Sequence, residues 1–517
     1  MTRFFTRVAA AWGPREGFAW LATSLIVVLF LIEFSQPIVQ ADDAFISYRY
    51  ALNLAHGNGL VFNQGEYVEG FTNLLWTLLV AAFIKIGVHA PAAGQALSLL
   101  FGAGSLLLLH IYVRCLLPRR FAWIAAAAPA VLLASNSFAC WMSTGLETPM
   151  VLFLTIAALL AFDRGRQITL AWMCVLALLC RPEGGLLAAV LLGVPWLQTI
   201  RRGPRTARRL ATATLPPLIF AAALVALTAF RLIYYHDYVP NTFHAKVGQA
   251  AVGLGWIYLE KFLLDGSLLL LPGAVLAAFT EPRLRVPLLF VLATIIYVIL
   301  TGGDVFTHGR FLLPIMPVLL AGVITTVPWL RARSRAGAWA MALTLPGAAL
   351  IYLYVIIPLP VAPGFGEYGY AASLPFPQSG KREEAKRHYF FVRDEKRIVR
   401  DLADKIRAAE PGAKLIACIG IGKMGYYNMD FVILDMVGLT DRHVAESQRR
   451  IANTFVVPGH SRTDSDYILS RRPDVIILPN IGALGANRLP AEVDMLGNPK
   501  LPESYRFVPD GGFWVRK

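Results

Sequence analysis

The chain has 517 residues, of which 56% are hydrophobic and 16% are charged, and its mean hydropathy is +0.55. Soluble domains carry roughly 25% charged residues, so this composition excludes a purely soluble protein, a disordered chain and a coiled coil. Five cysteines are too few for the disulfide framework of a small secreted domain. The net charge of +15 comes largely from arginines in short loops between apolar runs, which is typical of multi-pass membrane proteins and not of nucleic-acid-binding ones.

The first 362 residues contain twelve apolar runs and predict a polytopic α-helical membrane domain, because a spanning helix needs about 20 apolar residues. The runs begin near residues 18, 71, 93, 121, 148, 168, 185, 210, 263, 286, 310 and 337. The first run is long enough to span and lacks a small-residue cleavage site, so we interpret it as an anchor and not as a removable signal.

Arginine-rich loops predict the orientation of the spans, because cytoplasmic loops are enriched in Lys and Arg. Three arginines before residue 16 place the N-terminus in the cytoplasm. If the run at 71–88 crossed the membrane, the basic loop at 114–120 and every later basic loop would lie outside. That run contains Asn73 and Lys85, so we expect it to lie in the outer interface or to re-enter. Eleven spans are therefore predicted, with a first outer loop over 38–92 and an outer C-terminal domain.

Residues 363–517 are rich in charged side chains and predict a soluble α/β domain. Apolar spacing predicts an amphipathic helix over 393–409, followed by a turn at Pro411 and Gly412. Strand-like runs follow at Leu415–Ile419, Phe431–Leu434, Val475–Leu478, Tyr505–Val508 and Phe513–Val515.

The segment from Gly420 to Gly425 matches the G-x-G-x-x-G pattern of dinucleotide-binding folds. That fold needs a helix after the glycines and an acidic residue about 20 residues further on. The next strand-like run starts near Phe431 and leaves no room for the helix. We therefore interpret the segment as a glycine-rich turn and expect no nucleotide cofactor.

Two adjacent carboxylates, Asp42 and Asp43, follow the outer end of the first run. A carboxylate at this place can act as a general base toward a hydroxyl group. The pair can also bind a divalent cation or adjust each other's pKa, although no ligand spacing requires a metal site. The structural alternative is a pair of solvated residues at the membrane interface.

Other ionisable residues on the predicted outer side are candidates for function, because charges beside spanning helices are costly. Each has a structural alternative. Glu147 can cap the helix that follows it, Arg181 can extend to the headgroups, and Asp304 can serve a tight turn after two glycines. Glu183 is expected to pair with Arg181 and not to react.

The sequence from Asp42 to Trp76 resembles the first outer loop of GT-C glycosyltransferases, in particular the group that contains the terminal β-(1→2) arabinofuranosyltransferases of bacteria. Five shorter stretches occur in the order found in that group. They are Ser143–Glu147, Arg181–Gly184, Pro240–Phe243 with Lys246, Gly302–Asp304 with Arg310, and Asp435–Asp441.

This resemblance implies a multi-pass enzyme of the bacterial cytoplasmic membrane that uses a polyprenyl-phosphate sugar, with arabinofuranose preferred. The acceptor would be an envelope glycan, a lipid or a protein. A first-loop aspartate would act as the base of an inverting single displacement, with Asp42 preferred over Asp43, and outer cations would hold the lipid phosphate. The residues implied to contact donor or substrate are Arg49, Glu69, Asn73, Glu147, Arg181, Asn241, His244, Lys246, Asp304 and Arg310.

Two other functions stay open at this point. A transporter or flippase for lipid-linked sugars would show ionisable residues near the bilayer midplane and paired broken helices, and the sequence indicates neither. A membrane scaffold that presents the C-terminal domain would leave the clustered outer carboxylates and cations unexplained. The enzyme is therefore the preferred hypothesis.

Overall fold

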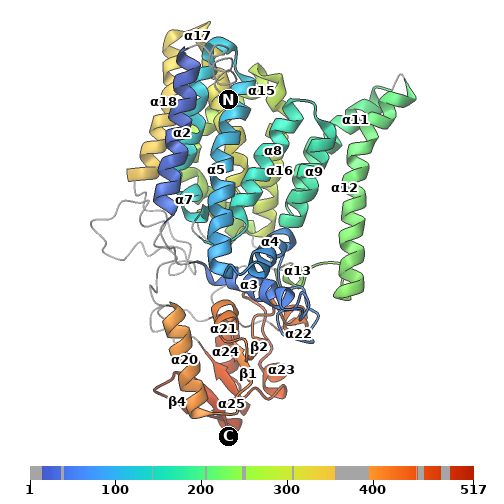
Figure 1. Cartoon of the computed structure of the whole chain (residues 1–517), viewed down its shortest axis with the longest axis vertical. Helices are drawn as coiled ribbons and strands as arrows, with labels where there is room; N and C mark the ends of the chain where they lie inside the picture. The colour runs from blue at the N-terminus through green and yellow to red at the C-terminus, as the bar shows by residue number, and fades with distance from the viewer. Residues whose placement is uncertain are drawn as a thin grey trace.

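The computed structural model describes residues 14–35, 40–142, 144–203, 206–246, 252–304, 308–354, 395–449, 451, 459–478 and 489–517. A bundle of long helices forms one end of the molecule, and a small α/β domain built from the C-terminal residues forms the other (Figure 1). Three shorter helices lie between these two parts: α3 (Asp42–Ala55), α4 (Leu74–Lys85) and α13 (Asn241–Lys246).

Each of the twelve predicted apolar runs falls on a helix or a bent pair of helices. These are α2 (Pro14–Phe34), α4, α5 (Ala90–Leu116), α6 (Ala127–Ala134) with α7 (Asn136–Met142), α8 (Thr148–Asp163), α9 (Gln167–Cys180), α10 (Gly184–Ala188) with α11 (Val194–Arg201), α12 (Ala207–Tyr234), α14 (Val252–Leu264) with α15 (Leu271–Thr280), α16 (Arg285–Thr301), α17 (Met316–Arg331) and α18 (Arg335–Tyr354). Within the described ranges, six helices are long and apolar enough to cross a membrane, or eight if each bent pair is one span. The chain is a multi-pass membrane protein, and the count of eleven spans stays a prediction.

The run at 71–88 forms only the 12-residue helix α4. At 1.5 Å per residue, such a helix covers roughly 18 Å of a hydrocarbon core about 30 Å thick. Helix α4 packs against α3, α5 and α9 at the end of the bundle next to the α/β domain. This length and place agree with the expectation that the run does not cross the membrane.

Several basic loops lie at the opposite end of the bundle, near the start of α2 (Figure 1). Arg114 at the end of α5 pairs with Glu16 in the first turn of α2. Arg283, before α16, donates hydrogen bonds to the carbonyl oxygens of Cys115 and Leu116. The arginine-rich loops and the C-terminal domain therefore lie at opposite ends of the helical bundle, which is the arrangement that the predicted topology requires.

The C-terminal domain is a five-stranded mixed sheet with strand order β2-β1-β3-β5-β4. The strands are β1 (Leu415–Cys418), β2 (Val432–Asp435), β3 (Val475–Ile477), β4 (Tyr505–Val508) and β5 (Phe513–Arg516), and the helices are α20 (Glu395–Ala409), α21 (Ile421–Tyr427), α22 (Arg442–Glu446), α23 (Ser465–Ser470), α24 (Pro490–Leu496) and α25 (Lys500–Ser504). The first three strands are parallel, whereas β5 runs antiparallel to both β3 and β4. All five predicted strands and the predicted helix are confirmed.

The three parallel strands are covered on both faces, which explains why they are short apolar runs. Ile416 and Ile433 belong to the hydrophobic core on one face, and Ala417 and Leu434 belong to the core on the other. Successive residues of a strand point to opposite faces, so a strand covered on both sides needs apolar residues at every position.

The glycine-rich segment forms the helix α21, so its interpretation as a turn was wrong. Strand β1 ends at Cys418 and β2 begins at Val432. The 419–431 connection between them holds a helix of seven residues, which is about two turns. The mistake came from treating the space before the next strand as too short for any helix.

Two of the membrane helices are broken, which we did not predict from the sequence. Helices α6 and α7 are bent by 64°, and the segment 252–264 is bent by 76° against 267–280. The two breaks meet, because Asn136 Nδ2 donates a 3.2 Å hydrogen bond to Asp265 Oδ1. Gly266 has a left-handed φ of 115° at the second break. The breaks lie at Ser-Asn-Ser (135–137) and Asp-Gly-Ser (265–267), short polar stretches inside apolar runs that the sequence analysis did not use. The argument that no broken helices are present was therefore wrong.

Candidate active site

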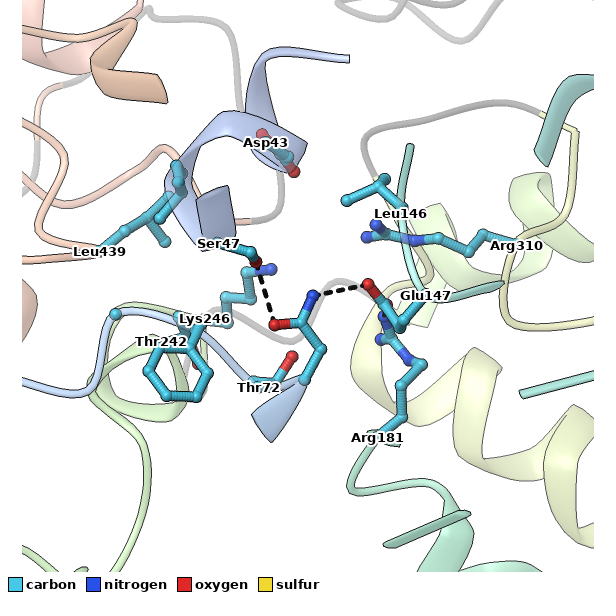
Figure 2. Close-up of a pocket in the computed structure, with 14 residues that line it drawn as sticks. Asp43, Ser47, Thr72, Leu146, Glu147, Arg181, Thr242, Lys246, Arg310 and Leu439 are labelled. Atoms are coloured by element: carbon cyan, nitrogen blue, oxygen red, sulfur yellow. Dashed lines mark hydrogen bonds and ion pairs between the residues drawn. The ribbon is translucent and has the colours of Figure 1, made fainter. Parts of the chain in front are cut away.

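A pocket of about 480 Å³, counting its opening to solvent, lies where the first outer loop, the helical bundle and the C-terminal domain meet (Figure 2). Nine polar residues of six separate segments line it together with Leu439 of the C-terminal domain. The polar residues are Asp43, Ser47, Thr72, Asn73, Glu147, Arg181, Thr242, Lys246 and Arg310. Six of the twelve residues that the sequence predicted for catalysis or binding therefore line one pocket.

Asp43 lines the pocket, whereas Asp42 does not. Both start helix α3, and residues adjacent in a helix point about 100° apart. The carboxylate of Asp42 accepts hydrogen bonds from the backbone N–H groups of Gly422 (3.0 Å) and Lys423 (2.8 Å) in the C-terminal domain. Among the described residues, the Asp43 carboxylate has no hydrogen bond or ion pair, so it is the one of the two that is available to a substrate.

Three cations face the same space from different segments: Arg181 follows α9, Lys246 ends α13, and Arg310 precedes α17. Lys246 and Arg310 both lie within the electrostatic reach of Asp43. Lys246 is exposed and makes no hydrogen bond or ion pair with any residue in the described part of the chain. It is therefore the cation most available to an anionic ligand.

A buried polar network holds the wall of the pocket around Glu147 (Figure 2). Glu147 Oε1 lies 2.5 Å from Arg181 Nη1, and its Oε2 accepts a 2.8 Å hydrogen bond from Asn73 Nδ2. Burial disfavours the ionised Glu147, but the charges of Arg181 and Arg310 outweigh burial and lower its pKa. Glu147 occupies the N-cap position of α8, the place that the structural alternative gave it, although its side chain makes no cap hydrogen bond. Glu183 pairs with Arg181 at 2.9 Å, as expected.

The second ion pair of the pocket joins Arg310 and Asp304, with Nε and Oδ2 2.8 Å apart. Asp304 follows two glycines with positive φ, Gly302 at 84° and Gly303 at 74°, so the tight turn that the sequence predicted is present. Both charged side chains are 5% exposed. Asp304 therefore orients Arg310 toward the pocket from a buried turn.

The structure places four other predicted site residues outside the pocket lining. Arg49 is 3% exposed and donates to the carbonyl oxygens of Phe62, Gly425 and Phe431. Glu69 forms a bidentate ion pair with Arg231 of α12, at 2.7 and 3.0 Å. These two residues tie the first outer loop to its neighbours.

Asn241 and His244 lie beside the pocket on α13. Asn241 Nδ2 donates to the carbonyl oxygens of Gly438 (2.8 Å) and Leu439 (3.1 Å), and His244 Nε2 lies 3.0 Å from Asp237 Oδ2. The 437–440 turn that meets Asn241 is held by Asp435, which accepts hydrogen bonds from Val437 and Thr440. Burial raises the pKa of Asp435 to about 6 against those hydrogen bonds.

Sequence reasoning missed several lining residues, of which Ser47 and Leu439 are two examples. Ser47 lies one helical turn after Asp43 and donates a 3.0 Å hydrogen bond to Asn73 Oδ1; its i+4 spacing was the available signal. Leu439 arrives from a turn almost 400 residues further along the chain, and no local pattern predicts that contact. Among the described residues, no group of three or more His, Cys, Asp or Glu side chains has an arrangement that can hold a metal ion.

The sequence is similar to one described family and to two curated proteins. Residues 390–515 match a family described as a domain of unknown function (DUF8728). Over 330 residues, 54% of this chain, the sequence is 31% identical to a terminal β-(1→2)-arabinofuranosyltransferase of Corynebacterium glutamicum. Over 271 residues, 47% of this chain, it is 31% identical to a protein of the same name from Mycobacterium tuberculosis. These matches cover 47% and 40% of the two relatives, so the chain spans less than half of their length.

The fold is similar to that of ArnT from Cupriavidus metallidurans in its crystal structure bound to undecaprenyl phosphate. The TM-score is 0.55, with 14% sequence identity, over 90% of this chain and 94% of that one. The apo structure of the same protein gives a TM-score of 0.51 over 91% of this chain and 95% of that one. The resemblance to GT-C glycosyltransferases that the first outer loop predicted is thus confirmed, in sequence by the arabinofuranosyltransferases and in fold by ArnT.

Proposed function

We propose that this protein is a glycosyltransferase of the bacterial cytoplasmic membrane that transfers a sugar, arabinofuranose first, from a polyprenyl-phosphate donor. The acceptor is an envelope glycan, a lipid or a protein at the outer face. The observation that carries the proposal is the pocket in which the carboxylate of Asp43 faces Arg181, Lys246 and Arg310. The names of the two sequence relatives support the reaction class, and the undecaprenyl phosphate bound to ArnT supports the donor class.

The chemistry is an inverting single displacement. Asp43 takes the proton of the acceptor hydroxyl while the hydroxyl oxygen forms a bond to the anomeric carbon of the sugar. The bond between that carbon and the phosphate oxygen breaks, and the lipid phosphate leaves with the electron pair. Cations that already surround the pocket stabilise the developing phosphate charge without having to reorganise. Lys246 and Arg310 are placed for this role. Arg181, which is held in the network with Glu147, adds a third positive charge beside the pocket.

The donor class is tested by incubating the purified protein in lipid with a panel of polyprenyl-phosphate sugars and an acceptor mixture. We expect one donor to be turned over, with release of the lipid phosphate, and we expect the Asp42→Asn/Asp43→Asn double variant to lose this turnover. Parallel reactions with a chelator test whether a divalent cation joins Asp43. Failure of every donor with folded protein would contradict the proposal.

A flippase for lipid-linked sugars is the second candidate, because the breaks of two membrane helices meet at Asn136 and Asp265. Paired broken helices are typical of secondary transporters. The two functions separate in proteoliposomes that contain a labelled lipid-linked sugar. Movement of the label between leaflets without sugar transfer supports the flippase, and transfer without movement supports the enzyme.

The proposed orientation places residue 202, in a basic loop of the bundle, in the cytoplasm. An Arg202→Cys variant is expected to resist a small impermeant thiol reagent in intact cells and to react after permeabilisation. A matched Phe507→Cys variant on an exposed strand of the C-terminal domain is expected to react in both cases. Both variants also carry the Cys115→Ser substitution. Cys115 is half-buried, whereas the other free cysteines in the described part of the chain are buried. Labelling of the 202 variant in intact cells would overturn the orientation.

A further inference from the structure

Helix α3 presents two different faces to its surroundings. Asp42, Phe45 and Arg49 follow the i, i+3, i+7 spacing of one helix face, and all three contact the C-terminal domain. Asp43 and Ser47 follow an i, i+4 spacing on the adjacent face and line the pocket. The rotation of α3 about its own axis therefore decides whether the Asp43 carboxylate points at the substrate.

Contacts with α21 fix that rotation at two positions along α3. At the first turn, both oxygens of Asp42 are held by the N–H groups of Gly422 and Lys423, so the carboxylate cannot turn freely. Two turns further on, Arg49 donates to the carbonyl oxygens of Gly425 (2.5 Å) and Phe431 (2.8 Å). Phe45 lies between these two positions, and its ring centroid is 5.3 Å from the ring centroids of both Tyr426 and Tyr427.

Two glycines of α21 allow this close approach. A Cβ at Gly422 would lie 2.0 Å from the backbone oxygen of Asp42, and a Cβ at Gly425 would lie 2.8 Å from Arg49 Nη1. Real Cβ atoms do not come within 3 Å of backbone atoms, so a side chain at 422 would force the two helices apart. Gly420, by contrast, has nothing within 4 Å of its Cβ position. The second and third glycines of the G-x-G-x-x-G pattern thus serve helix packing against α3.

We infer that the C-terminal domain sets the direction of the catalytic base, with Asp42 as a positioning residue that locks α3 onto α21. This inference rests on the proposed function, since it assigns the base to Asp43. The same domain also approaches Lys246 of the pocket, because a Cβ at Gly459 would lie 2.9 Å from Lys246 Cε. A displacement of about 1 Å in a catalytic group is enough to lower a rate by about 100-fold.

The test compares Gly422→Ala with Gly420→Ala, two identical changes two residues apart in the same segment. Gly422→Ala is expected to lower kcat about 10- to 100-fold and to leave the KM for the donor within about twofold, because the cations that bind the donor phosphate are untouched. Gly420→Ala is expected to retain wild-type kinetics. Asp42→Ala is expected to lower kcat in the same way. Asp42→Asn is expected to lower kcat less, because the amide oxygen of the new side chain still accepts one backbone N–H.

A double-mutant cycle keeps the inference testable if single variants lose stability for unrelated reasons. Asp42→Ala and Gly422→Ala disrupt the same contact, so their effects on kcat are expected to be far from multiplicative. Multiplicative effects, or wild-type kcat in Gly422→Ala, would overturn the inference. So would a loss above about 1,000-fold in Asp42→Asn, since that would assign the base to Asp42 itself.

A readout without turnover separates this inference from the proposed function. An Asp43→Cys variant carries a thiol at the base position, and its rate of reaction with a small thiol reagent reports how that position faces the pocket. Adding Gly422→Ala is expected to change that rate severalfold, whereas adding Gly420→Ala is expected to leave it unchanged. If wild-type protein turns over no donor but the rate still changes, the proposed function fails and the positioning by α21 stands. An unchanged rate in both backgrounds would overturn the positioning.

Discussion

Replacing Asp43 with Asn is expected to lower kcat for sugar transfer by about 100- to 10,000-fold, which is the range that a positioned general base contributes. The side chain keeps its size, and among the described residues no hydrogen bond or ion pair of Asp43 is lost. The melting temperature is therefore expected to stay close to that of the wild type, and the KM for the donor is expected to change little. Initial rates at saturating donor, together with thermal unfolding in detergent, check both expectations.

The Asp42→Asn variant is the matched control for this measurement. It makes the same change one residue earlier, at a carboxylate that accepts two backbone N–H groups and lies outside the pocket lining. A smaller loss of kcat than in Asp43→Asn is expected, with a loss of stability because one N–H group of α21 loses its acceptor. Near wild-type kcat in Asp43→Asn, or a larger loss in Asp42→Asn, would remove Asp43 from the role of base.

The sequence predicted the first outer loop as the place of chemistry, but it did not predict which aspartate lines the pocket. The resemblance preferred Asp42, whereas the pocket lies on the Asp43 side of α3. Two adjacent residues of a helix differ only in direction, and that direction is fixed here by α21, about 380 residues further along the chain. A local pattern carries no information about a contact of that separation.

Charged residues of the first outer loop also have partners that a local sequence pattern does not predict. The resemblance implied that Arg49 and Glu69 contact the donor or substrate. In the structure, backbone carbonyls of the C-terminal domain satisfy Arg49, and Arg231 of α12 satisfies Glu69. Arg181 and Glu183, two residues apart, were instead predicted correctly as a pair. Neighbours in sequence are predictable partners, while partners from distant segments require the fold.

The strands of the C-terminal domain were predictable for a related reason. Strands that are covered on both faces, as β1, β2 and β3 are, need continuous apolar runs, and those runs are visible in the sequence without knowledge of their partners. The breaks in the membrane helices were not predicted, because the polar stretches at 135–137 and 265–267 are only three residues long and the apolar composition continues on both sides of them. Composition therefore predicts where a helix lies in the chain better than it predicts where the helix bends.

Replacing Lys246 with Met is expected to lower kcat/KM for the lipid donor by about 10- to 150-fold. This range corresponds to the roughly 1.5–3 kcal/mol that a hydrogen bond to a charged group contributes. Lys246 is a cleaner probe of phosphate binding than the arginines of the pocket. Removing Arg181 would leave Glu147 and Glu183 buried without their partner, and removing one member of a buried ion pair costs about 3–5 kcal/mol of stability.

Lys246 has no hydrogen bond or ion pair within the described residues, so its replacement leaves no carboxylate without a partner. Fold stability is therefore expected to stay unchanged in Lys246→Met, which thermal unfolding checks. Lys85→Met, at an exposed lysine that ends α4 outside the pocket, is the matched control and is expected to keep wild-type kinetics. Lys246→Arg is expected to recover part of the donor affinity because it keeps the charge. Wild-type kcat/KM in Lys246→Met would show that Lys246 does not bind the donor phosphate.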